Sequence, residues 1–218
     1  MNTFSEENYL KAIFRLSQMP DNKKISTSAI AEALGNNPAS VVDMIRKLTD
    51  KQLIEYDKKK GVKLTTQGQK DAIQIVRKHR LWEVFLLEKL EYRWDEIHDI
   101  AEELEHIKYH DLADRLEKFL GFPEYDPHGD PIPKANGKMA KSFSASLADG
   151  KVGGSYRVAA VRDTSSEFLK YLHKLEINIG TQIKIIEQIA FDHSLIISID
   201  NGEATTVSSK FGENILIS

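Results

Sequence analysis

The chain has 218 residues, 41% of them hydrophobic, and contains no cysteine. A chain of this length can bury a sizeable core and commonly forms two or three modules. The lack of cysteine excludes disulfides, zinc ribbons and thiolate catalysis, so any metal must bind through His, Asp, Glu or backbone oxygen. No stretch approaches the roughly 18 apolar residues that span a bilayer, and the N-terminus is polar, so we expect a cytoplasmic protein that contacts no membrane.

The net charge of −3 is unevenly distributed. Residues 1–66 carry 11 Lys and Arg against 8 Asp and Glu, residues 67–121 carry 9 against 13, and residues 122–218 carry 10 against 12. A basic first third suits a module that faces phosphates, and an acidic middle third suits cation binding.

Helical spacing of apolar residues predicts three helices in the first third. The first begins at Ser5, where the following glutamates favour a helix N-terminus, and a polar break follows at Pro20-Asp21-Asn22. Ser26 or Thr27 caps the second helix, and Gly35 ends it. The third helix follows Pro38 and runs over residues 39–52. Two helices joined by a tight turn, with a polar outward face, are typical of a helix-turn-helix.

Residues 53–56 and 62–64 predict a β-hairpin whose tip contains three lysines. Such a tip can be a solvated edge that prevents aggregation. Directly after a helix-turn-helix, however, we interpret it as a wing that contacts DNA phosphates. Ser40, Asp43 and Arg46 are candidates for contacting base edges. The candidate DNA-binding residues are Asn37, Ala39, Ser40, Asp43, Arg46, Lys47, Lys58, Lys59 and Lys60.

The remaining sequence divides into three parts. Residues 66–120 are predicted to be helical, with breaks near residues 90–95 and 109–111. Their apolar stripes exceed what a winged helix covers, which favours a homodimer. Residues 122–150 hold four of the six prolines and predict a linker. Residues 151–218 predict a small β-barrel-like module. Its expected elements are strands at 156–161, 182–189, 195–200 and 204–207, a helix near 165–174 and a type I′ turn at Asn201-Gly202.

The middle part contains a candidate metal site. On a helix that turns about 100° per residue, four potential ligands project within one arc of about 100°. Two more, His79 and Glu83, lie one turn apart on the preceding helix. The four are His98, Glu102, Glu105 and His106. The alternative is the solvated face of an amphipathic helix. We expect surface or capping roles for His110, His128, His173 and His193.

The sequence resembles the diphtheria toxin repressor family, which contains iron-dependent repressors and manganese transport regulators. The resemblance rests on SEENYLKAIFRL, NNPASVVDMIRKL, RKHRLWEVFL, IHDIAEELEH and HGDPIP, in that order. It implies a mainly α fold with a β C-terminal module. The implied domains are a winged helix-turn-helix over residues 1–66, a helical dimerisation and metal-binding domain over 67–121, a linker over 122–150 and an SH3-like domain over 151–218.

The resemblance also implies ligands and partners. The primary site uses Glu102, Glu105, His106 and Asn8. The second site uses His79, Glu83 and His98, with Glu167 and Asp163 from the SH3-like domain as further ligands. The implied cofactor is Mn²⁺ or Fe²⁺, with Zn²⁺, Co²⁺, Ni²⁺ and Cd²⁺ as other ions that bind in vitro. The implied partners are a second copy of the chain and a palindromic DNA operator.

Three positions depart from the family pattern. Glu102 stands where the iron branch has a thiol, and a carboxylate there suits Mn²⁺. Asn8 replaces the aspartate of the manganese branch or the methionine of the iron branch. Lys11 stands where a manganese regulator has a carboxylate, and a protonated amine cannot bind metal. We predict that Lys11 pairs with the site's carboxylates and that a second ion binds at His79, Glu83 and His98.

Two other functions remain open from the sequence. One is a winged-helix repressor that responds to a small organic ligand, for which the His and Glu face is structural. The other is a carboxylate-histidine metalloenzyme, because sensor and catalytic sites share ligands and only catalytic sites need an open coordination position. We expect a regulator, with neither enzymatic activity nor a small organic substrate.

Overall fold

The computed structural model describes residues 2–19 and 24–218, and the predicted break at residues 20–22 lies outside them. The chain forms two compact units. Among the described residues, the first unit contains residues 2–19, 24–79, 102–115 and 133–138, and the second contains residues 80–101, 116–132 and 139–218. The long helix α4 (Thr66–Leu90) contributes its first half to one unit and its second half to the other.

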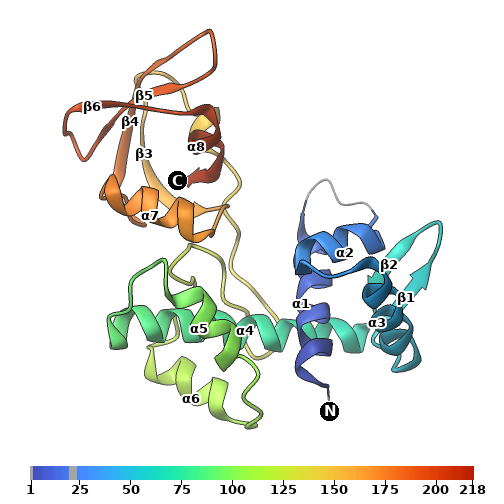
Figure 1. The fold of residues 1–218 in the computed structure, drawn as a ribbon. Helices are drawn as coiled ribbons and strands as arrows, with labels where there is room; N and C mark the ends of the chain where they lie inside the picture. Colours follow the sequence, from blue (N-terminus) through green and yellow to red (C-terminus); the bar gives the residue numbers. More distant parts are fainter. Residues whose placement is uncertain (1, 20–23) are drawn as a thin grey trace. The chain divides into compact units, whose positions relative to one another are not determined.

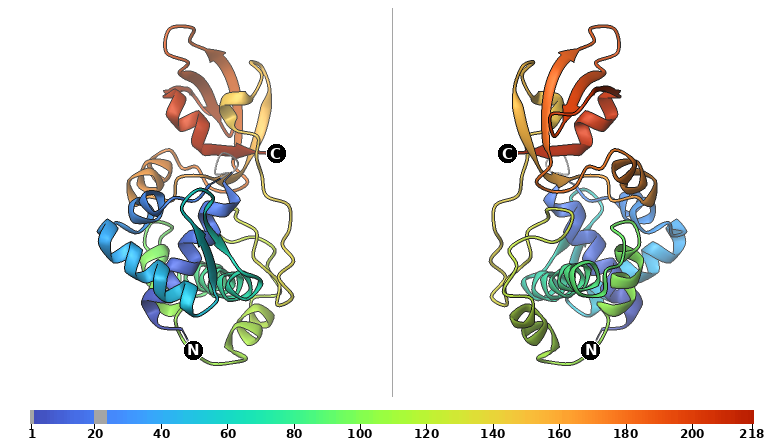
Figure 2. Two further views of the ribbon diagram at one scale, coloured as in Figure 1. Left: turned by 90° about the vertical axis from the view of Figure 1, so that its right-hand side faces the viewer. Right: turned by 90° about the vertical axis from the view of Figure 1, so that its left-hand side faces the viewer.

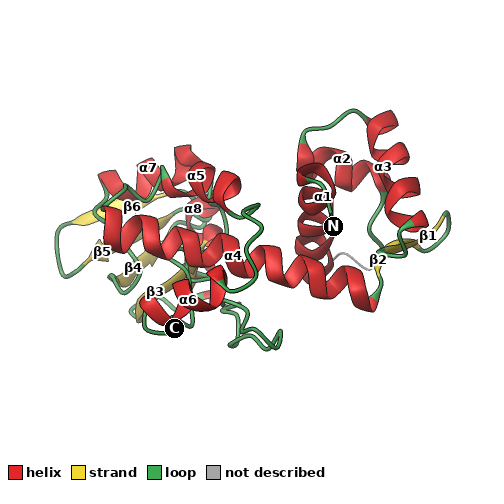
Figure 3. Cartoon of the chain, turned by 90° about the horizontal axis from the view of Figure 1, so that it is seen from below, coloured by secondary structure: helices red, strands yellow, loops and turns green. Residues whose placement is uncertain are grey.

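The first unit begins with a helix-turn-helix, as predicted. Its elements, drawn in Figures 1 and 3, are α1 (Phe4–Gln18), α2 (Thr27–Leu34) and α3 (Pro38–Asp50). Gly35 ends α2 in the left-handed conformation, with φ of 61°. The apolar stripes of the three helices meet in one core around Leu10, Ile13, Ile30, Val41 and Leu48.

Helix α1 starts earlier than the sequence indicates. Thr3, and not Ser5, precedes its first turn: the Thr3 hydroxyl accepts from Glu6 N, and the Glu6 carboxylate accepts from Thr3 N. This reciprocal capping box satisfies two backbone donors. It also fixes Glu6 and its neighbours at the start of α1.

The predicted wing is an antiparallel hairpin of β1 (Ile54–Asp57) and β2 (Gly61–Leu64). The Asp57 carboxylate accepts hydrogen bonds from the backbone N–H of Lys59 and Lys60, which holds the tip in a tight turn. Gly61 has φ of 82°, and a Cβ there would lie 2.4 Å from the carbonyl oxygen of Ile25. Only glycine therefore closes the wing without displacing the backbone.

The middle of the chain is helical, with breaks close to the predicted ones. After α4 come α5 (Ile97–Leu104) and α6 (Leu112–Phe119). Helix α5 ends at Leu104, so Glu105 and His106 occupy the turn that follows it. The assumption that all four candidate ligands share one helix is therefore wrong for these two residues.

Residues 122–150 have little regular structure, but they are not a free linker. Ile132 N donates to Glu124 O, and Asp126 N donates to Asp130 O. Val161 N donates to His128 O, so the loop is attached to a strand of the C-terminal sheet. The side chains of Asp126 and His128 are buried. Proline content predicted a spacer, whereas these hydrogen bonds make the segment part of the folded structure.

The C-terminal region is a five-stranded antiparallel sheet with strand order β6-β5-β4-β3-β7, which Figure 2 shows from two sides. Its core includes Val158, Leu169, Ile185 and Ile197. The elements are η1 (Leu147–Asp149), β3 (Ser155–Val161), α7 (Ser166–Lys174), β4 (Gln182–Gln188), β5 (Leu195–Ile199), β6 (Ala204–Val207), α8 (Ser209–Asn214) and β7 (Ile215–Ile217).

Three details of this region differ from the expectations. The tight turn between β5 and β6 is centred on Asp200 and Asn201, which have φ of 46° and 63°, and not on Asn201-Gly202. Gly202 N closes it by donating to Ile199 O. The short elements α8 and β7 were not predicted. A strand of three residues carries too little alternation to be recognised.

In the part of the chain that the structure describes, no helix has the length and apolar character needed to cross a membrane.

Candidate metal centre

The first cluster of candidate ligands lies in the first unit and is organised around Lys11 of α1. The Lys11 Nζ atom lies 2.6 Å from Glu102 Oε1 and 2.6 Å from Glu105 Oε2. Glu105 is 0% exposed and Lys11 is 5% exposed. The predicted pairing of Lys11 with the site's carboxylates is therefore confirmed. Burial strengthens this pairing, because the surroundings screen the charges less than water does.

His79 on α4 belongs to the same cluster. Its Nδ1 atom lies 2.7 Å from Glu105 Oε2 and 3.8 Å from Glu102 Oε1. The sequence assigned His79 to the second site alone. The structure brings one ring nitrogen of His79 and one oxygen of each glutamate within 4.8 Å of one another. This spacing allows a single cation to be shared.

His106 is oriented by a residue that the sequence analysis missed. Its Nδ1 lies 2.6 Å from Glu7 Oε2, and because a carboxylate only accepts, the ring donates there. In the tautomer that carries its proton on Nδ1, the ring presents Nε2 as an acceptor. A histidine held by a carboxylate in this way is the usual arrangement of a metal ligand. Phe4 also covers the His106 ring, with centroids 3.8 Å apart.

Within residues 2–19 and 24–218, the buried atoms of this cluster without a hydrogen-bond partner include Asn8 Oδ1, Glu105 Oε1 and His106 Nε2. Buried polar atoms without partners are costly and therefore call for a ligand or ion. Two oxygens and one imidazole nitrogen, joined by the Glu102 carboxylate, suit Mn²⁺ or Fe²⁺. The donor atoms present thus fit a divalent cation of this class.

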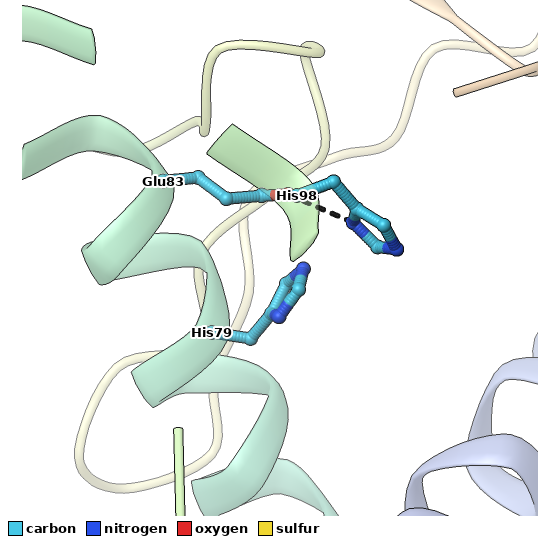
Figure 4. A group of neighbouring side chains, drawn as sticks. All are labelled: His79, Glu83 and His98. Carbon is cyan, nitrogen blue, oxygen red and sulfur yellow. Dashed lines mark hydrogen bonds and ion pairs between the residues drawn. The ribbon is translucent and has the colours of Figure 1, made fainter. Parts of the chain in front are cut away.

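A second cluster lies in the second unit. Glu83 on α4 and His98 on α5 form a hydrogen bond, with 3.2 Å between Glu83 Oε1 and His98 Nδ1. Figure 4 shows this pair, together with His79 one helical turn before Glu83. His128 Nδ1 lies 3.7 Å from the same Glu83 oxygen. Glu83, Asp126 and His128 each place a ligand atom within 4.8 Å of the others.

The residues of this second cluster are deeply buried. Glu83 and His128 are each 2% exposed, and Asp126 is 7% exposed. Burial, with the nearby charges of Glu83 and Asp130, raises the pKa of Asp126 to about 7 despite the opposing charge of Arg80. Burial alone would lower the pKa of His128, but its hydrogen bond to Glu83 and the surrounding carboxylates raise it.

The surface role expected for His128 is therefore wrong. Its ring is stacked on Trp94, with centroids 5.7 Å apart and 12° between the planes. The only sequence signal was the motif HGDPIP at residues 128–133, because residues in an irregular loop have no helical spacing.

The structure does not bring Asp163 and Glu167 into either cluster of ligand atoms within the described chain. Asp163 accepts a hydrogen bond from Ser165 N, next to the start of α7, and Glu167 is exposed in the first turn of that helix.

The candidate DNA-binding residues lie on α3, on its N-cap and at the wing tip. Asn37 caps α3 by accepting from Ala39 N. Ala39, Ser40, Asp43 and Arg46 are exposed, and the last two form a surface ion pair of 3.2 Å. Lys58, Lys59 and Lys60 are exposed at the wing tip.

Lys47 has a structural partner in addition to its predicted role. The fully buried Glu6 of α1 lies 3.1 Å from Lys47 and 2.8 Å from Lys51, both on or next to the end of α3. Burial favours a high pKa for Glu6, but the hydrogen bonds from Lys51, Thr3 and Lys47 outweigh it and lower the pKa to about 2. Glu6 thus connects α1, which carries Asn8 and Lys11, to the predicted recognition helix.

Comparison with known proteins decides the family. Residues 1–62 match the iron dependent repressor N-terminal DNA binding domain, residues 65–134 match the iron dependent repressor metal binding and dimerisation domain, and residues 145–218 match the FeoA domain. A solved structure of a manganese-dependent transcriptional repressor in complex with manganese is 33% identical, with a TM-score of 0.87, and the match covers 97% of this chain and 98% of that one. The chain belongs to the diphtheria toxin repressor family.

Curated members of the family show the same relationship. The iron-dependent repressor IdeR of Mycobacterium leprae is 32% identical over 58% of this chain, and the match spans 54% of IdeR's length. The regulator MntR of Oceanobacillus iheyensis is 34% identical over 56% of this chain and 81% of its own length. The predicted family and the predicted fold class, including the SH3-like C-terminal domain, are thereby confirmed.

Proposed function

We propose that this chain is a metal-dependent, DNA-binding transcriptional repressor that Mn²⁺ or Fe²⁺ activates. The observation that carries the proposal is that buried ligand atoms of Asn8, Glu105 and His106, beside the Glu102 carboxylate, have no hydrogen-bond partner among the described residues. An all oxygen and nitrogen site without thiolate favours Mn²⁺ or Fe²⁺ over softer ions. Zn²⁺, Co²⁺, Ni²⁺ and Cd²⁺ would occupy the same donors in vitro.

The proposed primary site consists of Asn8, Glu102, Glu105 and His106. A divalent cation there would neutralise buried carboxylates and tie the start of α1 to the turn after α5. A second ion would bind at His79, Glu83 and His98, and the buried Asp126 and His128 offer further ligands beside Glu83. The assignment of Asp163 and Glu167 to this second site remains a prediction.

The DNA-binding role rests on α3 and the wing. In the proposed complex Ser40, Asp43 and Arg46 face base edges, while Lys47 and the wing-tip lysines contact phosphates. A homodimer would place two recognition helices in successive major grooves about 34 Å apart, which requires a palindromic operator. Because Glu6 joins α1 to α3, an ion that fixes α1 would also fix the recognition helix.

The test is metal-dependent selection of DNA. Metal-stripped protein is used to select duplexes from a random library with and without Mn²⁺, and the selected duplex is then titrated by fluorescence anisotropy with Mn²⁺, anaerobic Fe²⁺ or Zn²⁺. We expect tight binding only with metal, and its loss in Glu105→Gln/His106→Ala. His173→Ala, which changes an exposed histidine on α7, is the control.

Equal binding with and without metal would contradict the proposal and favour a repressor that responds to an organic ligand. Turnover of an oxidant or a phosphoester by the metal-loaded protein would instead favour a metalloenzyme.

A further inference from the structure

Lys11 occupies the position between two carboxylates where a cation would bind. Its Nζ atom lies 2.6 Å from one oxygen each of Glu102 and Glu105. Those two carboxylates are also the ones that share a possible cation position with His79. In this structure the Lys11 ammonium group therefore takes the place of a metal ion between the two carboxylates.

The charge balance of the cluster explains why an internal cation is present. Glu105, which Lys11 contacts, is fully buried. A buried carboxylate without a compensating charge is strongly destabilising, so Glu105 needs a counter-charge before any metal arrives. Lys11, which is also buried, supplies one positive charge there, whereas a divalent ion would supply two.

The ammonium and a metal ion cannot both hold the same two carboxylate oxygens. His79 Nδ1 faces Glu102 Oε1 and Glu105 Oε2, which are the oxygens that Lys11 Nζ contacts. A cation held by these three residues would therefore need the oxygens that Lys11 now holds. A group tethered to the site competes at an effective concentration on the order of millimolar, which is high for a free competitor. Lys11 would thus raise the metal concentration needed to fill the site.

We propose that Lys11 is an intramolecular competitor of the metal: it holds Glu102 and Glu105 in the metal-free protein and leaves them when a divalent cation binds. This inference rests on the proposed function, because it assumes that the cation binds at these carboxylates. It assigns to Lys11 the role of setting the threshold of metal sensing. It also explains how the metal-free site stays folded.

The first test compares Lys11→Met with Lys108→Met. Lys108 is a matched control, because it also lies near the cluster but approaches Glu7 no closer than 3.8 Å. Isothermal titration of the metal-stripped full chain with Mn²⁺ should show affinity about tenfold or more higher in Lys11→Met, because the metal no longer displaces charged hydrogen bonds. Lys108→Met should change the affinity by less than about threefold, as expected for a weak and partly exposed pair.

Thermal unfolding distinguishes displacement of Lys11 by the metal from an ion pair that is purely structural and persists when metal binds. In chelator, Lys11→Met should lower the melting temperature by about 3 °C or more, since two carboxylates lose their counter-charge. At saturating Mn²⁺ the variant and the natural chain should melt together, because Lys11 no longer contacts the carboxylates. An equal loss with and without Mn²⁺ would overturn the proposal.

A third measurement needs no variant and remains decisive if Lys11→Met fails to fold. The natural chain is briefly acetylated with and without Mn²⁺, and labelling of Lys11 is compared by mass spectrometry with that of the exposed Lys24. If Mn²⁺ displaces Lys11 from the carboxylates, it should increase the labelling of Lys11 relative to Lys24. Unchanged or lower labelling of Lys11 in protein that binds Mn²⁺ would overturn the inference.

These experiments distinguish an error about Lys11 from an error about the proposed function. If the natural chain binds Mn²⁺ and metal-dependent DNA, but Lys11→Met leaves Mn²⁺ affinity unchanged, only the inference about Lys11 is wrong. If the natural chain binds no Mn²⁺ at all, the proposed function is wrong, and the inference that rests on it is wrong as well.

Discussion

At the scale of single residues, Glu7 decides how His106 presents its free nitrogen. Glu7 was not among the sequence candidates, because it lies on α1 and its partner lies 99 residues later in the chain. A charged acceptor on Nδ1 makes Nε2 a better metal ligand and fixes the ring.

We therefore predict that Glu7→Gln lowers Mn²⁺ affinity by about 10-fold to 100-fold while the protein remains folded. The neutral amide accepts a weaker hydrogen bond from His106, so the ligand nitrogen becomes less basic. Calorimetric titration measures the effect, with Glu103→Gln as the control, because Glu103 is exposed on α5. Equal affinities in the two variants would exclude a role for Glu7.

Glu6 contributes to stability rather than to ligand binding. Its carboxylate caps α1 and contacts both Lys47 and Lys51. Glutamine can keep the capping box but not the ion pairs, so Glu6→Gln isolates the ion pairs. We expect the free energy of unfolding of the metal-free protein to fall by about 2 kcal/mol, as measured in urea.

The matched control for Glu6 is Glu32→Gln, which changes an exposed glutamate on α2 and should alter the free energy of unfolding by less than about 0.5 kcal/mol. If Glu6→Gln changed the free energy of unfolding as little as this control, the ion pairs between α1 and α3 would not contribute to stability.

At the scale of elements, we expect the wing to contribute to the salt dependence of operator binding. The backbone of its tip is held by Asp57 and Gly61, so the three lysine side chains can be changed without changing the loop. We expect Lys58→Gln/Lys59→Gln/Lys60→Gln to weaken operator binding and to reduce the slope of log K against log salt by about 0.9 for each phosphate that the variant no longer neutralises.

Mn²⁺ affinity in the absence of DNA should be unchanged in this triple variant, because the wing lies outside the metal cluster. A salt slope equal to that of the natural chain would mean that the wing tip does not contact phosphates.

The elements also show where sequence reasoning succeeds. Caps, glycine positions and apolar periodicity predicted α2, α3 and the wing, because these signals are local. Helix α5 ends at Leu104, earlier than the spacing of its acidic residues indicated. The prediction that Glu105 and His106 project from this helix was therefore wrong, although both residues lie in the metal cluster. The ligand types were therefore recognisable without the correct local structure.

At the scale of the whole molecule, the residues that sequence reasoning missed share one property. Glu7, Asp126 and His128 become neighbours of the candidate ligands only through contacts between distant segments. Asp126 and His128 also lie in a proline-rich stretch that composition predicted to be a linker. No periodicity marks such residues, so only folding reveals them.

The central claim is that occupancy of the cluster at Glu102, Glu105 and His106 controls DNA binding. Thermodynamic linkage tests it most directly: Mn²⁺ affinity is measured calorimetrically for the natural chain with and without saturating amounts of the selected operator duplex. We predict that the operator tightens Mn²⁺ binding by the same factor by which Mn²⁺ tightens operator binding, about 5-fold to 150-fold. Mn²⁺ affinity that is unchanged by the operator, or coupling that persists in Glu105→Gln/His106→Ala, would contradict it.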